Sequence, residues 1–307
     1  MEMLVGIAVF ALGILLVVKG GDAFVEAAGG LARGMGLPTF LVGATVVSLA
    51  TTLPELMVSV LAAAQGKVEM AVGNALGSVT ANTALILASG MVMLPGVEMG
   101  KKLKIPCILL LTAIGGLYLA CSGGRLSGWG SGLLIGVCMA FLLYNVLWSR
   151  KDRAQTRETV TGAWVWKFLL GAAGIVAGSQ MLVSGGESIA KVLGVPERII
   201  AVTMVAVGTS LPELVTTLAA ISKGEAALSM GNIVGANIID LTLILPLSAL
   251  ASGDGLPISA QNLQVDLPGC GMVLLVAAVP LLLTGKSSRI LGVLLWVLYV
   301  CYLLCML

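Results

Sequence analysis

One stretch decides the fold of this chain: Val47-Ser48-Leu49-Ala50-Thr51-Thr52-Leu53-Pro54-Glu55-Leu56. It occurs twice, because a shift of 158 residues brings Thr51–Leu56 onto Thr209–Leu214, with Glu55 on Glu213. The same shift places Gly73-Asn74 on Gly231-Asn232, and Asn82 on Asp240, without a gap from about residue 20 to 87. Scattered Gly and Leu could match by chance in any apolar sequence. Two Pro-Glu and two Gly-Asn pairs in one register indicate an internal repeat.

The composition around these repeats is that of a membrane protein. Apolar residues make up 58% of the 307 residues and charged residues 10%, whereas soluble domains have roughly 45–50% and about 25%. The net charge of +2 gives no basic face for nucleic acid. Because the chain has no histidine, histidine metal sites and histidine proton relays are excluded. We expect an all-α protein in the bilayer.

A spanning helix needs roughly 20 apolar residues, and the chain offers ten such segments. They are residues 3–20, 39–64, 69–94, 104–122, 129–148, 164–184, 197–221, 226–251, 267–284 and 288–306. We expect a first five-helix half at 1–148 with its repeat at about 39–94, a short basic cytoplasmic loop at 149–163, and a second half at 164–307 with its repeat at about 197–251.

The distribution of Lys and Arg predicts the orientation, because cytoplasmic loops carry more of them. With the N-terminus outside, 13 of the 17 basic residues face the cytoplasm. We therefore expect a multi-pass protein of the cell (inner) membrane with both termini outside. Five spans separate the two copies, so the halves have opposite orientation. Inverted repeats are typical of alternating-access transporters, whose binding site lies near the middle of the membrane.

Three acidic residues lie inside the apolar runs: Glu55, Glu213 and Asp240. A charge at that depth costs roughly 2.5–3.5 kcal/mol on insertion scales. No basic residue occurs at comparable depth in the ten spans, so ion pairing does not offset this cost. These carboxylates must therefore either bind cations or be protonated. Both possibilities favour a role in transport over a structural role.

Neutral oxygens accompany these carboxylates on the same helix faces. Ser48, Thr51 and Thr52 precede Glu55 by seven, four and three residues, and Thr209 and Ser210 precede Glu213 in the same way. Proline lacks an N–H, so Pro54 and Pro212 are expected to break the helices and free backbone carbonyls near Ser48, Thr51, Ala206 and Thr209. Ser78 shares a face with Asn82, and Asn74 and Asn232 are candidates to support the ligands. Oxygen ligands without sulfur or imidazole suit Ca²⁺ or Na⁺.

The repeated motifs resemble the two repeats of the Ca²⁺/cation antiporter superfamily, and most closely its prokaryotic sodium/calcium exchangers. The resemblance covers the whole chain. It implies that Glu55 and Glu213 bind calcium together with the carbonyls of Thr51 and Thr209, and that Asn82 and Asp240 form a middle pair. It implies sodium ligands at two further sites: Ser78, Ser210 and the Ala206 carbonyl at the outer one, and Thr52, the Ser48 carbonyl and Glu213 at the inner one. The family carries a hydroxyl at the position of Ala236, which this chain lacks.

The resemblance also implies the mechanism. Several Na⁺ ions or one Ca²⁺ occupy overlapping sites in turn, the first and sixth spans slide against the remainder, and inward sodium flow drives calcium outward. No cofactor and no obligatory protein partner are expected beside the lipid bilayer and the transported ions.

Alternatives remain open at this stage. A Ca²⁺/H⁺ exchanger of the same fold would carry a Glu shortly after each Gly-Asn pair, which this chain lacks; a K⁺-dependent exchanger would carry a carboxylate at Asp240, which it has. From a different class, a cation channel would more naturally be an oligomer with a ring filter. An enzyme would need a nucleophile and a base, and no such pair is visible.

Overall fold

The computed structural model describes residues 2–94, 103–151, 162–194 and 209–306. Regular structure in these ranges is helical except for one short antiparallel pairing of β1 (Arg125–Leu126) with β2 (Leu256–Pro257). Seven of the described helices are long and apolar enough to cross a membrane, or eight if the bent pair Thr39–Thr51 and Leu53–Ala64 is one span. The expected all-α membrane fold is confirmed to this extent, and the ten-span arrangement stays a prediction.

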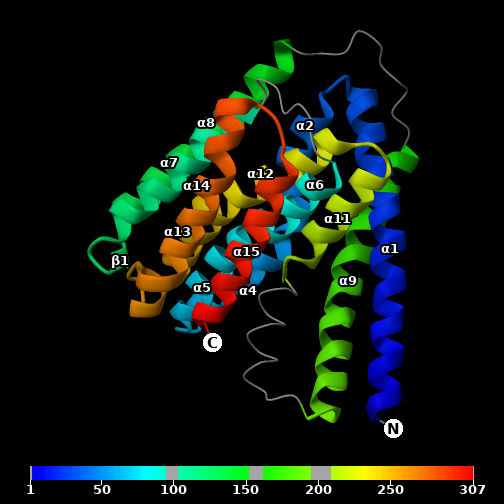
Figure 1. Ribbon diagram of the computed structural model, residues 1–307, viewed down its shortest axis with the longest axis horizontal. Coiled ribbons are helices and arrows are strands. Elements are labelled where there is room, and N and C mark those ends of the chain that lie inside the picture. The colour runs from blue at the N-terminus through cyan, green and yellow to red at the C-terminus, as the bar shows by residue number, and fades with distance from the viewer. Residues whose placement is uncertain (1, 95–102, 152–161, 195–208, 307) are drawn as a thin grey trace. The chain divides into compact units, whose positions relative to one another are not determined.

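The chain forms two compact units, each built from both sequence halves (Figure 1). Unit 1 comprises Met1–Pro54 and Asp152–Asn232, and unit 2 comprises Glu55–Lys151 and Ile233–Leu307. The helices of unit 1 are α1 (Glu2–Met35), α2 (Thr39–Val42), η1 (Gly43–Val47), α3 (Ser48–Thr51), α9 (Gly162–Val192), α11 (Leu211–Ser222) and the first half of α12 (Ala226–Ile239). The helices of unit 2 are α4 (Leu53–Ala64, from Glu55), α5 (Val68–Ala81), η2 (Asn82–Leu87), α6 (Ala88–Met93), α7 (Lys104–Cys121), α8 (Gly128–Lys151), the rest of α12, η4 (Asp240–Ile244), α13 (Leu245–Ala251), η5 (Asn262–Asp266), α14 (Leu267–Thr284) and α15 (Arg289–Met306).

Two long antiparallel helices dominate unit 1, α1 and α9, which lie side by side in Figure 1. Glycines spaced seven residues apart line their interface, Gly6, Gly13 and Gly20 on α1 and Gly171, Gly178 and Gly185 on α9. An added Cβ at Gly171 would lie 2.6 Å from the backbone nitrogen of Phe24. Small residues allow helix backbones to approach closely in membranes, so this spacing explains why the two helices pack along their length.

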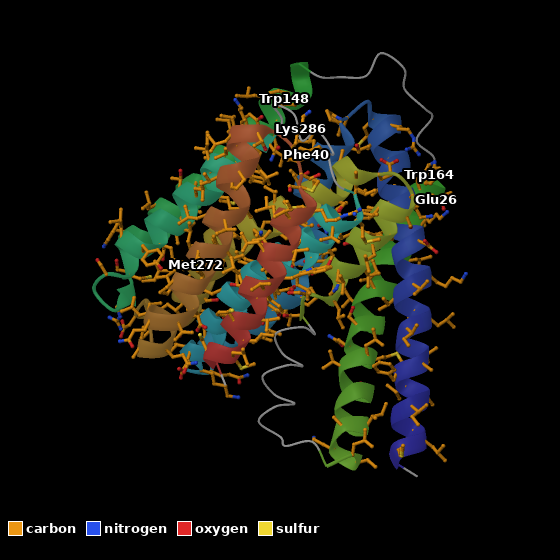
Figure 2. All side chains as sticks on the ribbon, in the orientation of Figure 1. Glu26, Phe40, Trp148, Trp164, Met272 and Lys286 are labelled. Carbon is orange, nitrogen blue, oxygen red and sulfur yellow. The ribbon has the colours of Figure 1, made fainter. Side chains whose placement is uncertain are left out.

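Both helices are longer than the sequence predicts, since the expected spans 3–20 and 164–184 stop where polar residues begin. α1 continues past Lys19, and the acidic side chains of Asp22 and Glu26 in its continuation form ion pairs with lysines of other segments. Lys167 on α9 pairs with Glu26 at 2.6 Å, and Lys223 pairs with Asp22 at 3.6 Å. Lys167 also lies over the Trp164 ring, which Figure 2 places beside Glu26.

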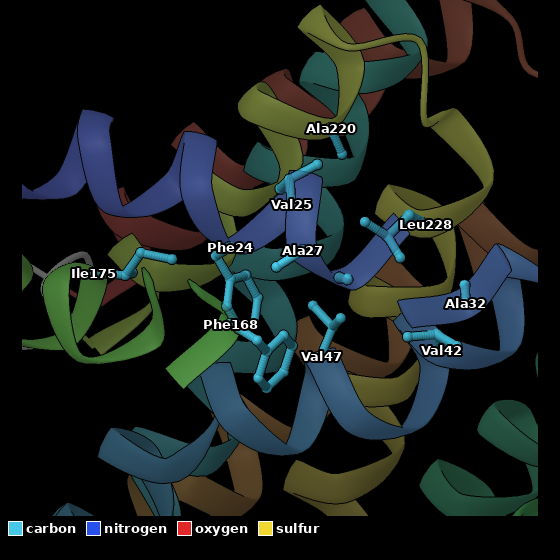
Figure 3. Close-up of a cluster of buried hydrophobic side chains, with 11 residues drawn as sticks. Phe24, Val25, Ala27, Ala32, Val42, Val47, Phe168, Ile175, Ala220 and Leu228 are labelled. Atoms are coloured by element: carbon cyan, nitrogen blue, oxygen red, sulfur yellow. The ribbon is translucent and has the colours of Figure 1, made fainter. Parts of the chain in front are cut away.

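The apolar core of unit 1 forms where α1 meets α9, α11 and α12. Phe24 and Phe168 stack at its centre with ring centroids 4.5 Å apart (Figure 3). Small side chains surround them, and Val25, Ala27 and Ala28 are fully buried. In unit 2, α14 packs against α5, α7 and α15, and α8 packs against α7, η4 and α13.

Glycine ends equivalent helices in the two repeats. Gly66 and Gly224 have φ angles of 76° and 73°, and Gly36 and Gly194 have 65° and 77°. The amide of Lys67 donates to the carbonyl of Ala62, and the amide of Glu225 to that of Ala220, as in a Schellman motif. Only glycine adopts this left-handed conformation at no steric cost, which explains why these matches hold across the repeat.

Candidate functional site

The repeated Pro-Glu motif begins a helix in both copies. Thr52 has φ −83° and ψ 1°, and its repeat equivalent Ser210, which precedes α11, has φ −89° and ψ 4°. The helices before and after Thr52 differ in direction by 46°. Both non-helical residues lie two residues before a proline, whose missing N–H and ring prevent continuation from the preceding turn. The predicted break at Pro54 is thus present, and the break predicted at Pro212 stays a prediction because residues 195–208 lie outside the described part.

The expected release of the Ser48 carbonyl is wrong for this conformation. That oxygen accepts the Thr52 amide at 2.9 Å, the Thr52 hydroxyl at 2.8 Å and the Thr51 hydroxyl at 3.2 Å. The α3 turn closes just before the break, so this carbonyl keeps helical partners. Ala206 lies outside the described residues, and Thr209 stands at the edge of them.

In unit 1 the described polar residues of both motifs are buried except Thr209, which is half-buried. Glu213 is fully buried on the first turn of α11, and Ser210, Thr51 and Thr52 are at most 3% exposed. α3 and α11 are in contact, so the unit brings residues of the two motifs together.

Asn232 organises this part of unit 1. Its Oδ1 accepts the Thr51 hydroxyl at 3.1 Å, and its Nδ2 donates to Thr216 Oγ1 at 2.9 Å. The amide therefore links α3 of the first repeat to α11 of the second. Thr216 was missed by the sequence reasoning; its position one turn after Glu213 was the available signal. The supporting role expected for Asn232 agrees with these bonds.

Unit 2 holds the other polar set. Glu55, Asn82 and Asp240 are fully buried, and Ser78 is 1% exposed. Asn74 Nδ2 donates to Ser59 Oγ at 2.9 Å and to the Glu55 carbonyl at 3.4 Å. Asn74 thus holds the turn that carries Glu55 by hydrogen bonds, as Asn232 does for Thr51.

Asn82 and Asp240 each begin a π-helix, η2 and η4, at equivalent positions of the repeat. Single π turns inside α-helices occur frequently at functional sites. The sequence reasoning expected regular helices here, and a wider turn has no periodic signature of its own. The structure therefore singles out these two positions independently of their residue types.

Several buried polar atoms have no hydrogen-bond partner within the described part of the chain. They include both carboxylate oxygens of Glu213, the hydroxyls of Ser78 and Ser210, and both amide atoms of Asn82. Leaving such a group unpaired costs about 1–3 kcal/mol, more for a charged one. The described residues contain no cluster of three acidic, cysteine or histidine side chains, so neutral oxygens must supply much of any coordination shell. Orphaned hard oxygens suit Na⁺ or Ca²⁺.

A further buried carboxylate escaped the sequence reasoning because the expected ninth span began one residue after it. Asp266 is 1% exposed, at the end of η5. It accepts Asn262 Nδ2 at 2.6 Å and the Tyr302 hydroxyl at 2.9 Å. Because both oxygens have donors, Asp266 pins η5 to α15 and is not an orphan of the same kind.

Comparisons with known proteins identify the family of the chain. The sequence model of the family described as sodium/calcium exchanger protein matches residues 5–147 and 163–307. The chain is 35% identical over 257 residues to the putative antiporter CaxA of Alkalimonas amylolytica, covering 79% of this chain and 80% of that protein. It is 34% identical over 266 residues to the inner membrane protein YrbG of Escherichia coli (strain K12), covering 81% and 80%.

A solved structure of the sodium-calcium exchanger NCX_Mj superposes on the chain with a TM-score of 0.86 at 26% identity, covering 98% of each chain. The family match covers both repeats, and the structural match extends over nearly the whole fold. The chain belongs to the sodium/calcium exchanger family of the Ca²⁺/cation antiporter superfamily, a family of membrane transporters.

Proposed function

We propose that this protein exchanges Na⁺ for Ca²⁺ across the cell membrane by alternating access and exports Ca²⁺ with the Na⁺ gradient. The observation that carries the proposal is the complete burial of Glu55, Glu213 and Asp240 in apolar helices. A transported cation is the counter-charge that these carboxylates are suited to bind.

Glu55 and Glu213 are proposed as the calcium-binding carboxylates, because two carboxylates neutralise one divalent ion. The neutral oxygens that complete the coordination are proposed to come from Thr51, Thr52, Ser48, Thr209, Ser210, Ala206, Ser78 and Asn82. Asp240 supplies a third charge, which suits the binding of more than one monovalent ion when calcium is absent. Overlapping sites of this kind make the binding of Na⁺ and Ca²⁺ competitive, which antiport requires.

Sodium is favoured over protons as the coupling ion. A Ca²⁺/H⁺ exchanger of this fold would carry a Glu shortly after each Gly-Asn pair. Neither the residues between Asn74 and Asn82 nor those between Asn232 and Asp240 include an acidic one. The orphaned groups around Glu213 and Asn82 are instead hydroxyls and amides, which ligate a metal ion but carry no exchangeable charge. The structural likeness to a sodium-calcium exchanger adds to this preference.

The opposite membrane orientation expected for the two repeats supports alternating access. Opposed copies of one helical unit allow two nearly equivalent conformations, each open to one side. We further propose ten spans with both termini outside, from the 13 basic residues that this orientation places in the cytoplasm. The relatives named as membrane or inner membrane proteins fit this location.

Calcium uptake into proteoliposomes tests the proposal. Proteoliposomes loaded with Na⁺ are diluted into Na⁺-free buffer with or without K⁺, and Na⁺-free proteoliposomes with an acidic lumen are diluted into alkaline buffer; ⁴⁵Ca²⁺ uptake is followed in each case. We expect uptake only with the outward Na⁺ gradient, and none with Glu213→Gln, which has similar volume but no charge. Uptake driven by the proton gradient alone would refute sodium coupling, and uptake by Glu213→Gln equal to wild type would refute the site.

A further inference from the structure

One polar contact in unit 2 breaks the symmetry of the repeat. Asn237 Nδ2 on the last turn of α12 donates to Thr83 Oγ1 on the first turn of η2 at 2.8 Å. Both residues are 1% exposed. Asn237 precedes Asp240 by three residues, and Thr83 directly follows Asn82. The bond therefore joins the two turns that carry this amide and this carboxylate.

The repeat equivalents of this pair are apolar. The shift of 158 residues carries Val79 onto Asn237 and Thr83 onto Leu241. At the position just before, the first copy carries the polar residue and the second the apolar one: Ser78 corresponds to Ala236. The oxygen-bearing side chain has thus moved by one residue, from Ser78 in copy one to Asn237 in copy two. Positions three and four residues before Asp240 lie on the same helix face, so either one can point an oxygen toward its neighbourhood.

Asn237 has one amide atom satisfied and one left over. Its Oδ1 is buried and has no hydrogen-bond partner in the described part of the chain. The Ser78 hydroxyl and the Asn82 amide of the same unit are buried and unpartnered as well. In the structure Nδ2 is the end that faces Thr83, so the remaining amide atom is the carbonyl oxygen.

We propose that Asn237 Oδ1 is a ligand of a transported Na⁺ ion, and that it replaces in the second repeat the hydroxyl that Ser78 supplies in the first. The assignment rests on the proposed function. A monovalent ion needs about one negative charge and several neutral oxygens, which Asp240 and the amides of Asn82 and Asn237 provide in unit 2. In this arrangement Thr83 Oγ1 accepts from Nδ2, and Oδ1 is left for the ion.

A purely structural role for the pair makes different predictions. If the bond only joined α12 to η2, removing either partner would lower stability alike and leave ion selectivity unchanged. The test compares Asn237→Val, which installs the residue of copy one, with Thr83→Val as the matched control. Na⁺ is titrated against the purified protein in choline buffer, and the half-saturating concentration is read from thermal stabilisation. Ca²⁺ is titrated in the same way.

We expect Asn237→Val to raise the half-saturating Na⁺ concentration at least fivefold and that of Ca²⁺ less than twofold, with Thr83→Val below twofold for Na⁺. Adding Ala236→Ser to Asn237→Val should recover most of the lost Na⁺ affinity, since it restores a hydroxyl oxygen at the neighbouring position. The assignment would be overturned if Asn237→Val bound Na⁺ as wild type does, or if it lost affinity for Na⁺ and Ca²⁺ equally. It would also be overturned if Asn237→Val and Thr83→Val lost Na⁺ affinity equally, or if adding Ala236→Ser did not recover Na⁺ affinity. Should Asn237→Val not fold, Asn237→Ala takes its place with the same expectations.

The binding readout separates this inference from the proposed function. Failure of wild-type protein to couple Na⁺ to Ca²⁺ in proteoliposomes refutes the function. Normal coupling together with unchanged Na⁺ binding in Asn237→Val refutes the ligand alone.

Discussion

A methyl group added at Gly231 tests how the fold positions the site. Gly231 lies in α12 at the point where α2 and η1 cross it in unit 1. A Cβ there would overlap the Phe40 carbonyl oxygen and lie 2.9 Å from the Ala44 nitrogen. Both are backbone atoms, so neither can rotate away. To bring the Cβ to an ordinary contact of 3.4 Å with the Phe40 oxygen, the helices must separate by roughly 1.2 Å.

The repeat equivalent, Gly73, is the matched control. A Cβ at Gly73 would meet only the Asn262 Nδ2 atom at 3.6 Å, which is ordinary contact. Both Gly→Ala changes gain about 0.5–1 kcal/mol of helix stability, so this term cancels between them. The difference is the overpacking cost at Gly231, about 1–3 kcal/mol. For a chain of this size that corresponds to an apparent Tm lower by on the order of 2–10 °C for Gly231→Ala than for Gly73→Ala.

The same displacement reaches the site through the next residue, Asn232. A shift of that size along the 3.1 Å bond from Thr51 to Asn232 would lengthen it to roughly 4.3 Å, beyond hydrogen-bonding distance. We therefore expect Gly231→Ala to reduce Na⁺-driven ⁴⁵Ca²⁺ uptake and Gly73→Ala to retain it, with melting followed by fluorescence-detected size exclusion. Equal melting temperatures for the two variants would refute the close-packing argument.

Three further predictions follow from the geometry. Asp240→Asn restores the residue type of its repeat equivalent Asn82 and removes the charge proposed for the Na⁺ site, so it should retain Ca²⁺ uptake in proteoliposomes but need a higher Na⁺ concentration to drive it; complete inactivity would show that the charge is required throughout transport. The exposed pair of Arg33 with Glu225, at 3.0 Å, should contribute no more than about 1 kcal/mol; Arg33→Glu should lower the apparent Tm slightly and Arg33→Glu with Glu225→Arg should restore it, and a large loss in the double variant would contradict this. Single cysteines at the exposed positions Arg125 and Lys286 should react with impermeant maleimide from outside and inside the cell respectively, and the reverse pattern would invert the topology.

Much of the site is predictable from the repeat because charge burial and proline chemistry are local. Glu55, Glu213 and Asp240 are fully buried as expected, since each lies in an apolar run too long to leave the bilayer. The break at Thr52 follows from the proline two residues later. The family and the helical class follow from the same motifs.

Other features depend on tertiary contacts that no local pattern encodes. The Ser48 carbonyl keeps helical partners because the turn closes before the break, which proline spacing alone does not reveal. The π turns at Asn82 and Asp240 have no periodic signature. α1 extends beyond its apolar segment because Lys167 and Lys223, which lie far away in the sequence, form ion pairs with Glu26 and Asp22. The Asn237–Thr83 bond joins residues 154 apart, so neither looked functional alone.

Equilibrium ⁴⁵Ca²⁺ binding to purified protein tests the central proposal, that buried carboxylates of both repeats bind the exchanged ion. Wild type, Glu55→Gln and Glu213→Gln are compared at one calcium concentration with increasing Na⁺. The proposal predicts calcium binding by wild type that Na⁺ displaces, and none above background for either Gln variant, although each elutes as a monodisperse protein. Calcium binding by both variants at the wild-type level, or wild-type binding that Na⁺ does not displace, would contradict it.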